Sequence, residues 1–135
     1  MEPKQKYVLL IEDDPDLVEL LTYNLNKAGY EVLSAFSGVQ AIWSTVAKNR
    51  PDCILLDLMM PSPDGYEICD FLKSSEDYRD IPIIIISARG APQDIEKAIN
   101  LGADVFLVKP FSIDSLLGLV GKYSTPRGEI RFPPP

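Results

Sequence analysis

The segment Tyr7-Val8-Leu9-Leu10-Ile11-Glu12-Asp13-Asp14-Pro15 decides the fold class of this chain. Its continuous apolar run, Tyr7–Ile11, is short and predicts a strand that is buried on both faces. Asp14 and Pro15 are typical of a helix N-cap followed by proline at the first helical position. A helix with one apolar stripe is therefore predicted to follow and to end at Gly29. The stripe comprises Leu17, Leu20, Leu21 and Leu25.

The same alternation of a short apolar run and a helical period continues along the chain. Four further strands are predicted, at Glu31–Phe36, Cys53–Leu56, Ile81–Ile86 and Val105–Val108. Pro82 is expected near the start of its strand, where a missing N–H donor is tolerated. Helices are predicted after these strands, and Ser37 and Ser112 are the expected caps of two of them. Five strand–helix units predict an α/β fold, with a doubly wound five-stranded parallel sheet covered by helices on both faces.

The composition limits the function classes. The 135 residues carry a net charge of −7, and 46% of them are hydrophobic, which indicates one globular domain and argues against binding to nucleic acid or an anionic membrane. The chain has no histidine, which excludes a Ser-His-Asp triad and the common zinc sites. Cys53 and Cys69 are expected to be packing residues. The sequence has no segment with the length and composition of a signal-peptide core or a membrane span, so a cytoplasmic location is expected.

The composition changes near the C-terminus. Residues 1–123 are predicted to form the domain, and 124–135 a Pro-rich tail or the start of a linker. Ser124–Gly128 is turn-like, and the chain ends in three prolines. Two interpretations stay open, because the domain could act alone or could be one part of a longer protein.

Polar residues follow four of the five predicted strands. They are Glu12, Asp13, Asp57, Ser87 and Lys109. Since the carboxyl ends of parallel strands share one edge of the sheet, these side chains are expected to meet in a cleft. Clustered carboxylates suit a hard cation such as Mg²⁺, with Mn²⁺ as a possible substitute. A metal, a lysine and a hydroxyl donor together can stabilise a phosphoryl group in transfer, and an aspartate can be the nucleophile.

Each of these residues also has an ordinary structural explanation when it is taken singly. Acidic residues after a strand commonly cap the next helix, and aspartate and serine commonly begin loops and turns. A lysine before a proline is commonly solvated. The combined pattern favours a site because four separate strand ends would have to carry these residue types by chance.

Four motifs then resemble the receiver domain of two-component response regulators, over roughly residues 6–122. The motifs are Ile11–Pro15, Leu56–Gly65, Ser87-Ala88 and Lys109-Pro110-Phe111. The resemblance implies the flavodoxin-like strand order 2-1-3-4-5. It also implies that Asp57 is the phosphoacceptor, that Lys109 contacts a phosphoryl oxygen, and that the Lys109–Pro110 bond is cis. The implied metal ligands are Asp13, Asp57, the backbone carbonyl of Met59, and Glu12 acting mostly through water.

The resemblance further implies what the chain does. A histidine kinase or phosphotransfer protein would supply the phosphoryl group, so the chain would not be a turnover enzyme. Ser87 would then move toward the phosphoryl group, and Phe106 would rotate into the space it leaves. The surface formed by the helix around Ile95–Ile99, the strand Val105–Val108 and the helix after Ser112 would change shape. That surface would bind an output protein or a linked effector domain, with homodimerisation possible and neither nucleic acid nor membrane bound directly.

Some features depart from the commonest pattern of the family or suggest other functions. Phe106 lacks the hydroxyl of a tyrosine, and Ser87 replaces the more usual threonine. The bulk of Met59 and the charge of Arg89 suggest that both shield an acyl phosphate from water. The main alternative is a pseudo-receiver that binds partners without phosphorylation. A haloacid-dehalogenase-type phosphatase would need a second acid two residues after Asp57, and a flavodoxin-like nucleotide binder would need a phosphate-binding loop after the first strand.

Overall fold

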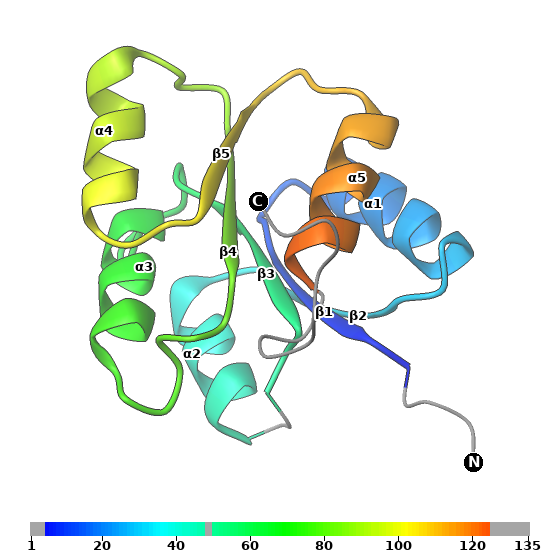
Figure 1. Cartoon of the computed structure of the whole chain (residues 1–135), viewed down its shortest axis with the longest axis horizontal. Helices are drawn as coiled ribbons and strands as arrows, with labels where there is room; N and C mark the ends of the chain where they lie inside the picture. Colours follow the sequence, from blue (N-terminus) through cyan, green and yellow to red (C-terminus); the bar gives the residue numbers. More distant parts are fainter. Residues whose placement is uncertain (1–4, 48–49, 125–135) are drawn as a thin grey trace, which may run out of the picture.

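The computed structural model of the chain describes residues 5–47 and 50–124. Strands and helices alternate throughout, as predicted (Figure 1). The strands are β1 (Tyr7–Ile11), β2 (Glu31–Ala35), β3 (Cys53–Asp57), β4 (Ile83–Ser87) and β5 (Val105–Val108). The helices are α1 (Pro15–Lys27), α2 (Gly38–Ala47), α3 (Gly65–Ser74), α4 (Pro92–Asn100) and α5 (Ile113–Tyr123).

The five strands form one parallel sheet in the order β2-β1-β3-β4-β5. This order confirms the predicted doubly wound fold. Helices α1 and α5 cover one face, and α2, α3 and α4 cover the other (Figure 1). The chain therefore reverses its winding direction between β1 and β3, and ligands of such sheets bind beyond the strand ends at this point.

The sheet is buried on both faces, which explains the continuous apolar runs of its central strands. Alternate residues of β1 enter opposite core clusters: Leu9 and Ile11 pack toward α2, α3 and α4, whereas Val8 and Leu10 pack toward α1 and α5. All four of these side chains are fully buried. A strand that faces two cores has no polar face, so its sequence shows no alternation.

Helix caps fix where the helices begin. The Asp14 carboxylate accepts from the N–H groups of Asp16 and Leu17, and the Ser37 and Ser112 hydroxyls accept from N–H groups three residues on, as predicted. Helix α3 has a capping box that joins Asp64 and Glu67. These side chains satisfy donors that the first turn of a helix leaves free.

Four strand boundaries differ from the prediction. Strands β3 and β4 end one residue later than predicted, at Asp57 and Ser87, because these residues still pair with Ile86 and Val108 of the neighbouring strands. Strand β4 begins at Ile83 rather than Ile81, because Pro82 has no N–H and the Ile83 N–H donates to the Asp104 carboxylate at 2.8 Å. Strand β2 ends at Ala35 rather than Phe36, because the Phe36 N–H donates to the Gln40 side chain at 2.7 Å. The predicted Pro-rich tail lies, from residue 125 on, outside the described residues.

A mostly buried lysine joins three segments at the edge of the sheet opposite the acidic strand ends. The Lys73 ammonium, at the end of α3, donates to the carbonyls of Arg79 and Ile81 at 3.1 and 2.9 Å. It also pairs with Asp104 at 3.0 Å, and the two side chains are only 11% and 19% exposed. This group of contacts, the Lys73–Asp104 tie, holds α3 to the strands that begin beside it.

Candidate functional site

The polar residues predicted at the strand ends meet at one edge of the sheet. Glu12 follows β1, Asp57 and Ser87 end β3 and β4, and Lys109 follows β5. Glu12, Asp57 and Ser87 are at most 3% exposed, although Asp and Glu are rarely buried without a partner. Their burial in a group indicates a built site rather than a solvated surface cluster.

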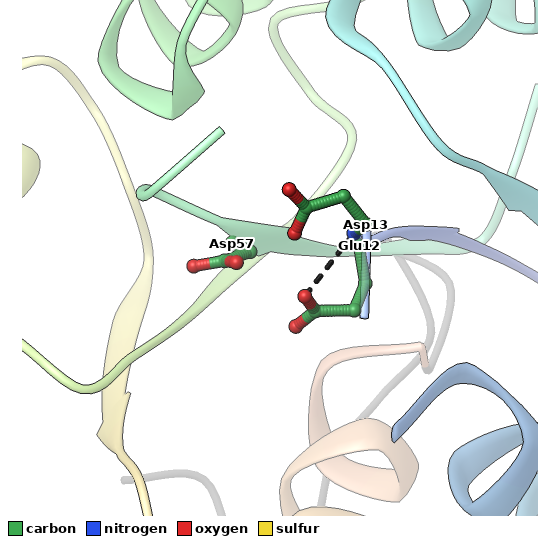
Figure 2. Close-up of side chains that lie close together, drawn as sticks. All are labelled: Glu12, Asp13 and Asp57. Carbon is green, nitrogen blue, oxygen red and sulfur yellow. Dashed lines mark hydrogen bonds between the residues drawn. The ribbon is translucent and has the colours of Figure 1, made fainter. Parts of the chain in front are cut away.

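Three carboxylates form the centre of this edge. Glu12, Asp13 and Asp57 each offer one oxygen, and these oxygens lie within 4.8 Å of one another. Figure 2 shows the three side chains grouped at the ends of β1 and β3. Ligands of Mg²⁺ lie about 2.0–2.1 Å from the ion, so two ligands on opposite sides are about 4.2 Å apart. The three oxygens would therefore need to move together only slightly, or not at all, to bind a small hard cation.

Lys109 reaches this carboxylate cluster from the opposite end of the domain sequence. Its ammonium donates to Glu12 Oε1 at 2.8 Å and lies 3.7 Å from Asp57 Oδ2. The Lys109–Pro110 peptide bond is cis, as the resemblance implied. One lysine thus faces three carboxylates, and the cluster keeps a net negative charge that a cation would balance.

The protonation equilibria reflect this imbalance. Burial raises the pKa of Glu12 to about 7, although the hydrogen bond from Lys109 opposes the rise. Burial by itself would lower the pKa of Lys109, but the hydrogen bond to Glu12 and the nearby Asp57 carboxylate outweigh it and raise the pKa above its ordinary value. Lys109 therefore stays charged at neutral pH and provides a fixed positive charge beside Asp57.

Backbone contacts fix the Asp57 carboxylate and the chain that follows it. Asp57 Oδ1 accepts from the Met59 N–H at 3.0 Å. Gly65, at the start of α3, packs directly on this turn: a Cβ at position 65 would lie 2.5 Å from the Asp57 carbonyl oxygen and 2.5 Å from Leu58 Cα. The motif Leu56–Gly65 therefore needs glycine at position 65, because α3 begins against the backbone of the site.

Ser87 and Phe106 lie on the same face of the sheet. Ile85 is paired with Phe106, and Ser87 is two residues beyond Ile85 on β4. Ser87 is fully buried, and its hydroxyl oxygen accepts from the Arg89 N–H at 3.1 Å. Phe106 is partly buried and packs against the core beneath α2, α3 and α4. The structure thus brings together two residues that the sequence separates by nineteen positions.

The Arg89 guanidinium lies 3.9 Å from the Met59 sulfur, and both residues were predicted to flank this site. Two further features were not predicted from the sequence. The Arg89 guanidinium also lies 3.9 Å from the Asp94 carboxylate in the first turn of α4. A cavity of about 510 Å³ also opens beside Lys109, between α1 and the segment that leads into α5. Its lining is Asp14, Leu17, Leu20, Ala88, Lys109, Pro110, Phe111 and Ile113. Neither Asp94 nor the shape of this cavity has a local sequence signal.

The sheet order and its acidic edge define the class of doubly wound α/β proteins that bind ligands at the strand ends. A family model described as the response regulator receiver domain matches residues 8–120. The chain belongs to this family, which is the receiver domain of response regulators in two-component systems. Members of the family bind Mg²⁺ at an acidic pocket and interact with histidine kinases and output domains.

Individual relatives agree with this assignment. The chain is 38% identical over 113 residues to the DNA-binding dual master transcriptional regulator RpaA of Synechocystis, covering 84% of this chain and 46% of RpaA. It is 40% identical over 110 residues to the response regulator MprA of a Mycobacterium species, covering 82% of this chain and 46% of MprA. The chain therefore spans about half the length of these relatives.

Solved structures agree as well. A putative response regulator from Chloroflexus aurantiacus superposes with a TM-score of 0.85 at 30% identity, covering 91% of this chain and all of the other.

Across residues 5–47 and 50–124, no helix combines the length and the apolar composition that crossing a membrane requires.

Proposed function

We propose that this chain accepts a phosphoryl group on Asp57 from a partner phosphohistidine and changes its α4–β5–α5 surface in response. The observation that carries the proposal is the placement of Asp57. This carboxylate is almost fully buried at a strand end, 3.7 Å from the Lys109 ammonium and beside the carboxylates of Glu12 and Asp13. Asp57 thus lies beside a lysine cation and within a carboxylate cluster that could hold a metal ion, and the chain has no histidine to compete with it.

Asp57 supplies the nucleophile in this mechanism. One carboxylate oxygen attacks phosphorus in line, the new O–P bond forms, and the P–N bond to the donor imidazole breaks. Lys109 stays protonated and stabilises charge on the phosphoryl oxygens. The Met59 N–H holds Asp57 Oδ1, so the carboxylate cannot rotate freely as it reacts.

The acidic pocket would hold Mg²⁺ through Asp13, Asp57 and the Met59 carbonyl. When bound, the ion neutralises charge on the transferring phosphoryl group. Glu12 suits an indirect role through water, because protein donors already occupy both of its carboxylate oxygens. Oε1 accepts from Lys109, and Oε2 accepts from the N–H groups of Asp13 and Asp14.

Ser87 and Phe106 would carry the signal to the surface. The Ser87 oxygen accepts from Arg89, so its own O–H can donate to a phosphoryl oxygen on Asp57. A shift of Ser87 would give Phe106 room to turn inward, since both lie on one face of the sheet. Phosphorylation then biases an equilibrium between two arrangements of α4, β5 and α5.

The partners in this proposal are a histidine kinase or phosphotransfer protein and an output protein or linked effector domain. The cavity beside Lys109 offers the donor an apolar contact next to the reacting atoms. The net charge of −7 argues against direct nucleic-acid binding by this domain, although RpaA is named as DNA-binding. The absence of direct nucleic-acid binding stays a prediction, and so does homodimerisation.

The test is intact-mass measurement after incubation with acetyl phosphate, with Mg²⁺ and with a chelator in its place. We expect one added phosphoryl group, seen only with Mg²⁺ and released by hydroxylamine as an acyl phosphate should be. A folded protein that gains nothing from acetyl phosphate or from a phosphorylated phosphotransfer protein would instead favour a pseudo-receiver. Metal-independent labelling would contradict the role of the acidic pocket.

Met59 and Arg89 are expected to lengthen the life of the acyl phosphate. The two side chains contact each other at 3.9 Å, and the backbones of the two residues bind Asp57 and Ser87, so we expect them to hinder the approach of water. Met59→Asn and Arg89→Glu should each shorten the dephosphorylation half-life by about two- to tenfold, an effect of about 0.4–1.4 kcal/mol on the barrier. The measurement follows loss of the phosphoryl group after donor removal, and half-lives equal to that of the wild type would refute shielding.

A further inference from the structure

Arg89 lies between the phosphorylation site and helix α4. Its backbone N–H donates to the Ser87 hydroxyl, and its guanidinium contacts the side chain of Met59, whose own N–H holds Asp57. On the other side, Arg89 Nη2 lies 3.9 Å from Asp94 Oδ1. The Arg89 side chain is 63% exposed, so it has room to change partners without disturbing the core.

Asp94 is held in place much more firmly than Arg89. It lies in the first turn of α4, and its side chain is only 15% exposed. Its backbone carbonyl accepts from the Tyr66 hydroxyl of α3 at 3.5 Å. The Lys97 ammonium, one turn along α4, lies 4.1 Å from the centre of the Tyr66 ring. Asp94 is thus part of a contact between α3 and α4, and Arg89 is the partner that can leave.

We infer that Arg89 is an exchangeable latch, which pairs with Asp94 while Asp57 is unmodified and moves to a phosphoryl oxygen once Asp57 is phosphorylated. This inference rests on the proposed function and specifies how the site communicates with α4. The exchange follows from the strengths of the two contacts. An ion pair at 3.9 Å whose arginine is largely exposed contributes little, whereas arginine makes short charge-assisted hydrogen bonds to phosphoryl oxygens.

The exchange would alter α4 through Asp94. Phosphorylation adds negative charge next to Arg89 and so draws the guanidinium away from the helix. Asp94 then loses its cationic partner, and the turn that joins Ser87 to α4 loses one of its contacts with the first turn of the helix. By linkage, a change at Asp94 that weakens this contact and leaves Arg89 intact must favour the phosphorylated arrangement.

The test is a double-mutant cycle on the full chain with beryllofluoride and Mg²⁺ as the phosphoryl mimic. Asp94→Asn should tighten beryllofluoride binding by about threefold, since Arg89 no longer has a competing partner. In an Arg89→Gln background, Asp94→Asn should have no effect. Glu96→Gln is the matched control, because it removes one exposed carboxylate from the same helix. Binding is followed by backbone NMR, which also reports changes in residues 90–95 directly.

The outcomes separate this inference from the proposed function. Tightening by Asp94→Asn that vanishes without Arg89, with Glu96→Gln unchanged, supports the latch. An unchanged affinity in Asp94→Asn, or equal tightening with and without Arg89, overturns the latch alone. Failure of the wild type to bind beryllofluoride and to accept a phosphoryl group overturns the proposed function, and the latch with it.

Discussion

Replacing Asp57 with asparagine should abolish phosphorylation of the chain by acetyl phosphate and by a phosphohistidine donor. The amide has the shape of the carboxylate, and its oxygen can still accept from the Met59 N–H, so the fold should survive. An uncharged amide is a poor nucleophile toward phosphorus, and it also removes one ligand from the acidic pocket. The intact mass of Asp57→Asn should therefore equal that of a sample without donor.

The control is Asp70→Asn, which removes an exposed carboxylate from α3 that accepts a hydrogen bond from the Ser74 hydroxyl. This variant should accept the phosphoryl group as the wild type does. A phosphoryl group on Asp57→Asn, mapped to another residue by peptide analysis, would contradict the assignment of Asp57. Loss of labelling in both variants would indicate damage to the fold rather than to the site.

Replacing Lys73 with methionine should lower the free energy of unfolding by about 3 kcal/mol. Methionine keeps most of the apolar stem of lysine but leaves the carbonyls of Arg79 and Ile81 without this donor. It also leaves the largely buried Asp104 carboxylate without its ammonium partner. Urea unfolding followed by circular dichroism measures the change, and the slope of the transition should stay constant.

Lys27→Met is the matched control, because Lys27 is exposed in the last turn of α1. Its effect should stay within about 0.5 kcal/mol. A Lys73→Met variant no less stable than this control would show that the Lys73–Asp104 tie contributes nothing net to stability. That outcome would mean that the desolvation cost of the pair cancels its attraction.

Much of the fold could be predicted from local signals. Strands Tyr7–Ile11 and Val105–Val108 have the predicted bounds, because each is a short apolar run with clear turn residues on either side. The Asp14 and Ser112 caps also follow from residue type and position alone. The strand order came from the family resemblance, since the local patterns do not say which strands are neighbours.

The site was predicted as a group of residues rather than as a set of contacts. Residues at the carboxyl ends of parallel strands must share one edge, so Glu12, Asp57, Ser87 and Lys109 were expected together. Which atoms meet there depends on side-chain rotamers and on register. The hydrogen bond from Lys109 to Glu12 joins residues 97 positions apart, and no local pattern encodes it.

The sequence by itself determined the alternating order of strands and helices and the burial of the sheet on both faces, because these depend on short-range periodicity. It also determined the residue types at the functional edge, because the carboxyl ends of parallel strands lie at one edge of a sheet. The tertiary structure alone decided the pKa of Glu12, the start of β4 at Ile83 and the pairing of Arg89 with Asp94. Each of these depends on burial or on a partner from a distant segment. Such partners come within reach only after the chain has packed both faces of its sheet.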